Sequence, residues 1–376
     1  EVNGGFFWPW RLLRQYPAFG VLTFFFFIAL LRAYPVEDFT YLVSRLRIKV
    51  PFLLLPIAFL YLPRFTAEDI RRLLYFLLAI LTLTSLGILI NYLLDFEAIN
   101  ELLRQGHHIP TPRNHIRYSL FTAWAVIGGI YLWYHRFYVW RPGERWLIGG
   151  MTIFLFLFLH LLSVKSGLLV LYLCLGLGLL QYAWRRRAYM VALIGIGGLV
   201  LLPMLAYRMV PSFQSKIDYF IHDLTQWQKG EGAHYSDSGR LASLDAGWTI
   251  AREHWLWGVG TANMRPQVRA FYTEHYPDYP DPFMPQNQFL FAWASAGLLG
   301  LFGSLFAFFF PLLYRRNYRH ALFLNFYLAI FVIIMIEHAL ENAVGVAHYL
   351  FFLLVFLSHL NTRGGRIACQ PTKPTA

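Results

Sequence analysis

Residues 73–94 read LLYFLLAILTLTSLGILINYLL, and this stretch decides the fold. None of its 22 side chains is charged. A helix of that length rises about 33 Å, enough to cross the roughly 30 Å hydrocarbon core of a membrane. The rest of the 376-residue chain has the same bias, because 57% of its residues are hydrophobic and 14% are charged, whereas soluble domains carry about 25% charged residues. The sequence therefore predicts an integral membrane protein.

Apolar runs of this kind recur, and we expect an all-α integral membrane protein with about ten transmembrane helices. The runs centre on residues 18–31, 50–62, 73–94, 120–133, 147–162, 168–183, 190–206, 288–313, 322–336 and 344–360. One long polar, aromatic-rich segment interrupts them, and a polar tail follows them. We therefore expect an N-terminal transmembrane bundle, a catalytic loop, C-terminal transmembrane helices and a tail, at residues 1–207, 208–286, 287–360 and 361–376.

The net charge of +12 raises the question of a nucleic-acid partner, but the positions of the charges argue against one. Most Lys and Arg residues fall in short segments on one side of the membrane, as expected of cytoplasmic loops. This orientation puts the long loop outside and the tail in the cytoplasm. Residues 32–49 are the exception, because Arg45, Arg47 and Lys49 then fall outside. These three could lie among lipid headgroups or bind an anionic ligand, and the sequence leaves both open.

The long loop contains a predicted amphipathic helix. The sequence Ser-Asp-Ser-Gly-Arg at residues 236–240 offers capping side chains. Residues at spacings of three and four then predict an apolar face, and they are Leu241, Leu244, Trp248, Ala251 and Trp255. Arg240 lies in the first turn, where backbone N–H groups and a guanidinium together predict an anion site.

Other cations fall on the same predicted side of the membrane. Lys165 interrupts two apolar helices, where a charge is costly without a partner or water. Arg113 and Arg117 precede a span. Each could instead bind a lipid headgroup, but Lys165, Arg240 and one of Arg113 or Arg117 together would clamp a pyrophosphate.

Acidic and histidine residues after the ninth run are the remaining candidates on that side. Glu337 and Glu341 would share a face if their helix continued. They could bind the clamp's cations or cap the helix, and the structural role is favoured. His338 and His348 are interpreted as polar residues at the membrane interface.

The sequence predicts no metal site and no bound cofactor. His107 and His108 are adjacent rather than four residues apart, and no HExxH motif occurs. The Gly258-Val259-Gly260 sequence follows no predicted strand, which argues against a dinucleotide site.

Three segments resemble the O-antigen ligase and O-antigen polymerase superfamily of membrane enzymes, which move a glycan from a polyprenyl pyrophosphate carrier. Their order around a long outer loop is what carries the resemblance. They read LSVKSGLL at residues 162–169, SGRL at 238–241 with WLWGVG at 255–260, and PQNQFL at 285–290 with AGLLG at 296–300. Ligases of this superfamily usually have twelve helices, with nine before the catalytic loop. Seven runs precede the loop here, so the resemblance implies that two N-terminal helices are absent from this chain.

Two positions depart from the superfamily pattern. Its members generally carry Arg where Lys165 stands, and lysine keeps the charge but loses the bidentate fork. They carry His, proposed as the base that activates the acceptor, where Gln286 stands, and glutamine cannot take a proton. Either the reaction depends chiefly on positioning and leaving-group stabilisation, or another residue is the base. The candidates are His254, His234, His275, Glu337 and Glu341.

The resemblance implies a metal-independent inverting glycosyltransferase that needs no nucleotide sugar. It would take a glycan from undecaprenyl pyrophosphate, at the periplasmic face of a bacterial inner membrane, and join it to a sugar hydroxyl of lipid A core. Arg240, Lys165 and Arg113 or Arg117 would hold the pyrophosphate. Gln286 and Asn287 would orient the acceptor, and a stacking surface would come from Trp248, Trp255, Trp257, Tyr272 and Tyr276.

Other functions remain open at this point. A polymerase that extends the glycan, or a protein O-oligosaccharyltransferase, would use the same donor. A transporter or flippase for lipid-linked sugars belongs to another class, and its expected signature is internal repeats and charges within broken spans. Neither is found in this sequence.

Overall fold

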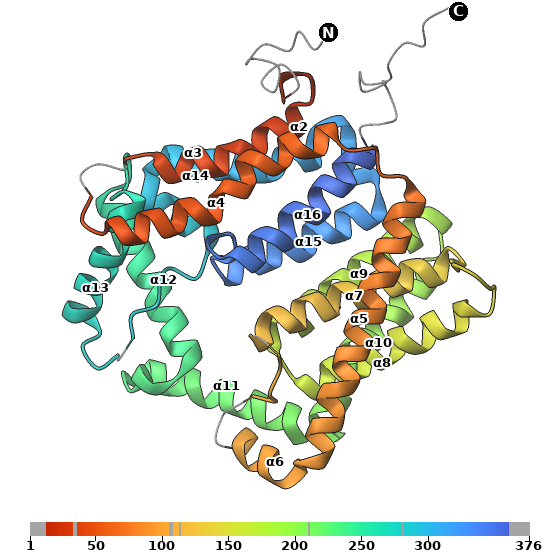
Figure 1. Cartoon of the computed structure of the whole chain (residues 1–376). Helices are drawn as coiled ribbons and strands as arrows, with labels where there is room; N and C mark the ends of the chain where they lie inside the picture. Colours follow the sequence, from red (N-terminus) through yellow and green to blue (C-terminus); the bar gives the residue numbers. More distant parts are fainter. Residues whose placement is uncertain are drawn as a thin grey trace, which may run out of the picture.

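The computed structural model describes residues 13–32, 36–104, 108–112, 114–209, 211–279 and 281–360. Every regular element within these residues is a helix (Figure 1). The α-helices are α2 (Pro17–Gly20), α3 (Phe24–Leu30), α4 (Phe39–Tyr61), α5 (Ala67–Leu94), α6 (Phe96–Arg104), α7 (His115–Tyr134), α8 (Glu144–Leu162), α9 (Lys165–Arg186), α10 (Tyr189–Met209), α11 (Pro211–Lys229), α12 (Ser236–Glu253), α13 (Met264–His275), α14 (Gln288–Leu313), α15 (Ala321–Ile336) and α16 (Ala343–Leu360). Short 3₁₀ helices are η1 (Val21–Thr23), η2 (Gly232–His234), η3 (Thr261–Asn263), η4 (Tyr314–Arg319) and η5 (Ala339–Glu341).

The all-helical class and the membrane character are confirmed. Each of the ten predicted apolar runs lies largely within helix. Six helical segments in the described chain are long and apolar enough to cross a membrane, namely α5, α8, α9, α10, the segment Gln288–Arg319 and α16. The segment Pro17–Leu30 and α15 are shorter apolar helices. The total of ten spans and the side on which each loop lies stay predictions.

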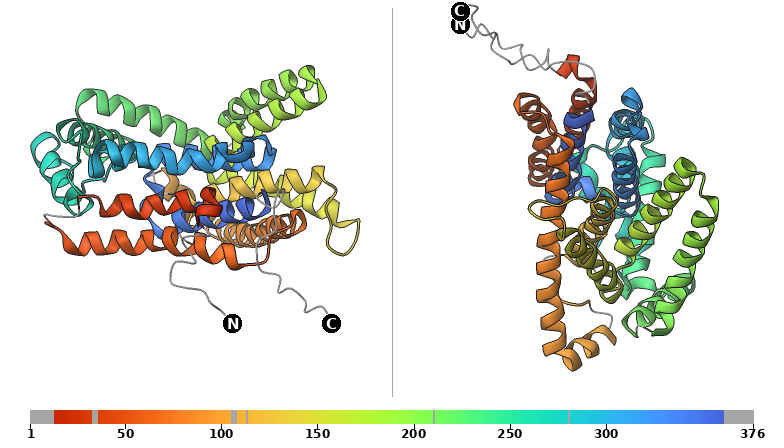
Figure 2. Two further views of the ribbon diagram at one scale, coloured as in Figure 1. Left: turned by 90° about the horizontal axis from the view of Figure 1, so that it is seen from above. Right: turned by 90° about the vertical axis from the view of Figure 1, so that its right-hand side faces the viewer.

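The helices form two packed groups. One contains α3, α4, α14 and α16, and the other contains α5, α7, α8, α9 and α10 (Figures 1 and 2). Helix α15 packs on both α14 and α9 and so joins the groups. Trp124 of α7 is fully buried, with Phe326 and Phe352 edge-on to its ring. Aromatic packing therefore fills the centre of the bundle.

Helix α4 differs from the sequence expectation. It begins at Phe39, so Arg45, Arg47 and Lys49 lie on the helix rather than in a loop. The reason lies far along the chain, because Lys49 Nζ is 2.5 Å from Glu341 Oε1 and both side chains are buried. Arg45 donates to the backbone carbonyl of Glu341. A charge that finds such a partner can enter a packed bundle.

A loop and a broken helix interlock beside α12. Helix α14 leaves helical geometry at Gly297, whose φ is +63°. The segment after α12 docks on that break, with Val259 N–H donating to Ala294 C=O at 2.9 Å and Gly260 N–H donating to Ser295 C=O at 2.8 Å. A Cβ on Gly297 would lie 2.1 Å from the Leu256 carbonyl oxygen. The sequences WLWGVG and AGLLG are therefore two halves of one structural feature.

The start of α12 is held by Asp223 of α11, which is fully buried. Its carboxylate accepts the backbone N–H of Asp237 at 2.8 Å and that of Ser238 at 3.0 Å, and also the Ser238 hydroxyl. A carboxylate at a helix start satisfies N–H groups that have no partner within the helix. The first turn of α12 is therefore fixed from another helix.

The face of α12 that packs is not the predicted one. Its buried positions are mostly small residues, including Ala242, Ser243, Ala246 and Gly247. A Cβ on Gly247 would lie 2.8 Å from the Pro285 side chain, so small residues let α12 approach the chain that leads into α14. Trp248 is exposed.

We expect replacement of Lys49 by Met to lower the free energy of unfolding by about 3–5 kcal/mol, because it leaves the Glu341 carboxylate buried without its ammonium partner. The Lys49→Met/Glu341→Gln double variant should recover most of that loss. Arg47→Met, on an exposed position of the same helix, is the control and should change stability by less than about 0.5 kcal/mol. Unfolding in detergent micelles measures all three, and equal stability of the two single variants would contradict the prediction.

Asp223→Asn should lower the free energy of unfolding by about 1–3 kcal/mol, because the charged acceptor of two N–H groups is lost in a buried place. Asp218→Asn, at an exposed position of the same helix, is the matched control. The same unfolding measurement compares them, and a wild-type midpoint for Asp223→Asn would refute this account of the helix start.

Candidate functional site

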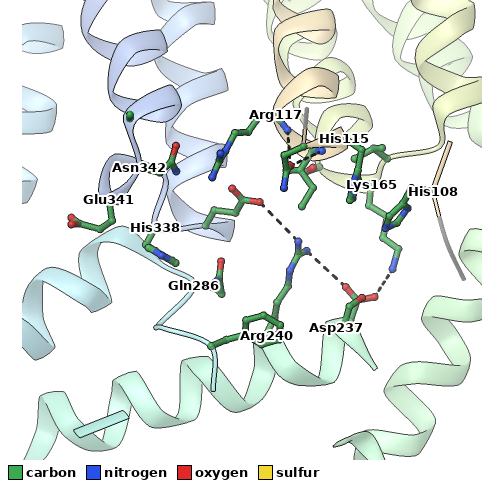
Figure 3. A pocket seen from close by; sticks show the side chains of 18 of the residues that line it. His108, His115, Arg117, Lys165, Asp237, Arg240, Gln286, His338, Glu341 and Asn342 are labelled. Carbon is green, nitrogen blue, oxygen red and sulfur yellow. Dashed lines mark hydrogen bonds and ion pairs between the residues drawn. The ribbon is translucent and has the colours of Figure 1, made fainter. Parts of the chain in front are cut away.

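A cavity of about 550 Å³ lies where the ends of several helices meet. Its lining includes residues from α4, α7, α9, α11 and α12 and from the segments that follow α13 and α15. Figure 3 shows side chains from these separate elements around a common space. The lining residues discussed here are Arg45, Arg117, Lys165, Lys216, Asp237, Arg240, Gln286, Glu337, His338 and Glu341.

An alternating chain of charges crosses the cavity (Figure 3). Lys165 Nζ lies 2.5 Å from Asp237 Oδ2. Arg240 Nη1 lies 3.9 Å from the other oxygen of Asp237, and its Nη2 lies 4.0 Å from Glu337 Oε1. The side chains of Lys165 and Arg240 are 37% and 34% exposed. Both cations are thus neutralised in part while they remain open to a ligand.

The cavity has an excess of positive charge. Among the described residues, five cationic side chains line it, and they are Arg45, Arg117, Lys165, Lys216 and Arg240. Three described carboxylates line it, those of Asp237, Glu337 and Glu341. The balance of five against three leaves a net charge of +2 with every group ionised. Such a cavity attracts a multiply charged anion.

Lys216 of α11 is a cavity residue that the sequence did not single out. Burial and the nearby Lys165 ammonium lower its pKa to about 8, against the opposing effect of Asp237. A bound anion would favour its protonated form. No local pattern marks it, because α11 reads as an ordinary polar helix.

Asp237 is the second residue that sequence reasoning passed over. It was interpreted only as a capping side chain, whereas it connects Lys165 with Arg240. Its position three residues before Arg240 was the available signal, since residues at that spacing are neighbours on a helix.

The predicted anion site at the α12 start differs in the structure. The N–H groups of Asp237 and Ser238 already donate to the Asp223 carboxylate. These backbone N–H groups are therefore not available to a ligand, and the cations near this helix start are the side chains of Arg240 and Lys165.

Glu337 and Glu341 lie on separate elements, because α15 ends at Ile336 and η5 follows. Glu341 pairs with Lys49 and accepts from Gln288 Nε2 at 2.9 Å. Despite burial, that ammonium and this amide hold the pKa of the Glu341 carboxyl below its usual range. Burial raises the pKa of Glu337, although Arg240 and Arg117 oppose the rise.

His338 lines the cavity, contrary to its interpretation as an interface residue. Burial lowers its pKa to about 4, against the opposing effect of Glu341. Its imidazole is therefore neutral near pH 7.

Gln286 lines the cavity, as a residue that contacts an acceptor would. Asn287 is the N-cap of α14, and its Oδ1 accepts the N–H groups of Phe289 and Leu290, each at 3.0 Å. Its Nδ2 donates to the Met335 carbonyl at 3.2 Å. The structure thus gives Asn287 a capping role.

The remaining sequence candidates that the structure describes fall outside the cavity lining. His254 is the C-cap of α12, and its carbonyl accepts the Gly258 N–H at 2.7 Å. Trp248 and Trp255 are exposed, and Trp248 packs edge-on against Trp293. His275 stacks on Phe271. Arg113, His107, the His234 side chain and the tail at residues 361–376 lie outside the described part of the chain.

Among the described residues, no group of three or more His, Cys, Asp or Glu side chains is arranged to hold a metal ion. None of the curated proteins compared with the chain matches it. Residues 150–305 match the family model described as O-Antigen ligase. That segment contains Lys165, Asp237, Arg240 and Gln286 and all three sequence segments of the resemblance. The match confirms the resemblance to the O-antigen ligase and O-antigen polymerase superfamily over these residues.

Proposed function

We propose that the cavity binds the pyrophosphate of an undecaprenyl-linked glycan and that the protein transfers this glycan to a sugar hydroxyl of lipid A core. The reaction would take place at the periplasmic face of a bacterial inner membrane. The observation that carries the proposal is that Arg117, Lys165, Lys216 and Arg240, from four different helices, line one cavity. The family match over residues 150–305 supports glycan transfer as the chemistry.

Donor binding would rearrange the charges of the cavity. In the structure Asp237 holds Lys165 and approaches Arg240. A pyrophosphate offers several anionic oxygens and would compete with that single carboxylate for both cations. The two cations would then stabilise the charge that develops on the leaving group, which is the transition-state interaction the reaction needs.

Glu337 is the proposed proton acceptor. Gln286 cannot act as a base, Glu341 is bound to Lys49 and Gln288, and His338 has a pKa of about 4. Glu337 faces the cavity, and its ion-pair partner Arg240 is the residue that would turn to the pyrophosphate. Burial raises its pKa, which improves a carboxylate as a base.

The bond changes follow from these assignments. The acceptor oxygen attacks the anomeric carbon of the donor sugar, and its proton passes to Glu337. The bond from that carbon to the pyrophosphate oxygen breaks, and its electron pair leaves with the carrier. Attack opposite the leaving group inverts the anomeric centre. Gln286 would hold the acceptor by hydrogen bonds, as a side chain that lines the cavity without charge.

If Arg240 and Lys165 bind the pyrophosphate, we expect their removal to have a large kinetic effect. Purified protein with an undecaprenyl pyrophosphate-linked glycan and lipid A core should lose roughly 10²- to 10³-fold in kcat/KM in Arg240→Ala and in Lys165→Ala, because each removes a donor to the leaving group. Lys165→Arg should retain activity, since it keeps the charge and adds a fork. Arg252→Ala, at an exposed position of α12 outside the cavity, is the control. Unchanged turnover in both alanine variants would remove the clamp, and transfer to a free glycan repeat in place of lipid A core would reassign the acceptor.

The assignment of Glu337 predicts a pH effect. The active form is the carboxylate, so kcat/KM should fall as the pH falls through the pKa of Glu337, which burial places above the ordinary value. Glu337→Gln should reduce kcat by roughly 10²-fold and abolish that acidic limb. Glu253→Gln, at an exposed position of α12, should keep the wild-type profile. A wild-type rate in Glu337→Gln would show that another group takes the proton.

A further inference from the structure

A second, larger cavity of about 1180 Å³ lies at the opposite end of the bundle from the candidate site. Three helices connect the two. α7, α9 and α15 each have one end at the first cavity and the other end at the second. The 20 residues of α7 rise about 30 Å, the thickness of a hydrocarbon core. The second cavity therefore lies at the level of the other membrane surface.

The wall of this cavity is mostly apolar, and glycines in it leave open space. Part of the cavity is a slot between α9 and α10, and α10 lies at the outer edge of the bundle (Figure 2). Glycines 178, 195 and 198 line the wall, together with Leu179 and Leu199. A Cβ on Gly178 or Gly198 would meet nothing within 4 Å. An apolar slot beside a single outer helix has the shape and chemistry for an acyl chain.

The mouth of the cavity is strongly basic. Arg185 and Arg186 end α9, and Arg315, Arg316 and Arg319 belong to η4. The described lining contains no Asp or Glu. In the described part of the chain, no carboxylate forms an ion pair with any of these five arginines. Five guanidinium groups without a carboxylate partner lie beside an apolar slot. This combination suits a ligand that is anionic at one end and apolar at the other.

Two further features lie at the mouth. Arg315 and Arg316 both have positive φ, +48° and +60°, a conformation that non-glycine residues adopt rarely and that clusters at functional sites. Asn325 in the wall is 6% exposed, and its Oδ1 has no hydrogen-bond partner among the described residues. That oxygen is itself buried, so it is an unsatisfied polar atom within the wall.

We propose that this cavity binds an anionic glycerophospholipid from the membrane leaflet at that end. The phosphate contacts the arginines of η4 and α9, and an acyl chain lies in the slot between α9 and α10. A second copy of the chain does not suit the site, because the arginines of its own mouth would repel these. The inference is independent of the proposed transfer reaction.

The test uses purified protein in detergent, phosphatidylglycerol as the probe and native mass spectrometry as the readout. Phosphatidylglycerol should bind at least tenfold more tightly than phosphatidylcholine, and free glycerol phosphate should not compete, because it lacks the chains. Arg315→Gln/Arg316→Gln should weaken binding by roughly 25-fold, since each arginine near an anionic lipid contributes about fivefold. The control is Arg136→Gln/Arg187→Gln, which is matched in residue type, exposure and positive φ and lies outside the cavity lining.

A second pair of variants tests the slot without altering charge. Gly198→Leu fills a lining position, and Gly197→Leu adds the same side chain at the neighbouring position, which does not line the cavity. Only Gly198→Leu should reduce phosphatidylglycerol binding, at an unchanged unfolding midpoint. Equal binding of phosphatidylglycerol and phosphatidylcholine, competition by free glycerol phosphate, or wild-type binding in both Arg315→Gln/Arg316→Gln and Gly198→Leu would overturn the proposal. Loss of transfer activity with normal lipid binding would bear on the first cavity alone.

Discussion

The structure depends on one constraint, that a positive charge placed among apolar helices must meet a partner. Lys49 can lie inside α4 because Glu341 reaches it from the segment between α15 and α16. Lys165 can begin α9 because Asp237 of α12 reaches it. Each pairing joins parts of the chain that are distant in sequence, so charge neutralisation also decides which helix ends come together. The cavity forms where those pairings meet.

The interlock between the segment after α12 and the break in α14 supplies the rigid support for this arrangement. Positive φ at Gly258, Gly260 and Gly297 lets the two backbones approach closely enough to exchange hydrogen bonds. The helix that carries Arg240 is thereby fixed at its far end, while the Asp223 carboxylate fixes its start. Because both ends of α12 are fixed, the position of Arg240 in the cavity is fixed as well.

Much of the fold could be predicted from the sequence, because apolar runs long enough to span a membrane have few alternatives to helix. Arg240, Lys165 and Arg117 could be named because they are cations on the predicted outer side of the membrane, and Gln286 because of its place in the superfamily resemblance. The partners of these residues could not. Asp237 is 72 residues from Lys165, and no local periodicity encodes such a contact. The start of α4 was misplaced for the same reason, since its charges looked costly until the buried Glu341 was known. Trp248 and Trp255 were placed on the packed face by their spacing, whereas the face of α12 that packs is formed mainly by small residues.

The carboxylate of Asp237 also bears on how a catalytic cycle would end. An enzyme that grips a spent lipid carrier with several cations risks being inhibited by its own product. If the cavity binds the carrier as proposed, the Asp237 carboxylate would pair again with Lys165 and Arg240 once the carrier moves away. Such an internal substitute would lower the barrier to product departure and allow repeated turnover without an external helper.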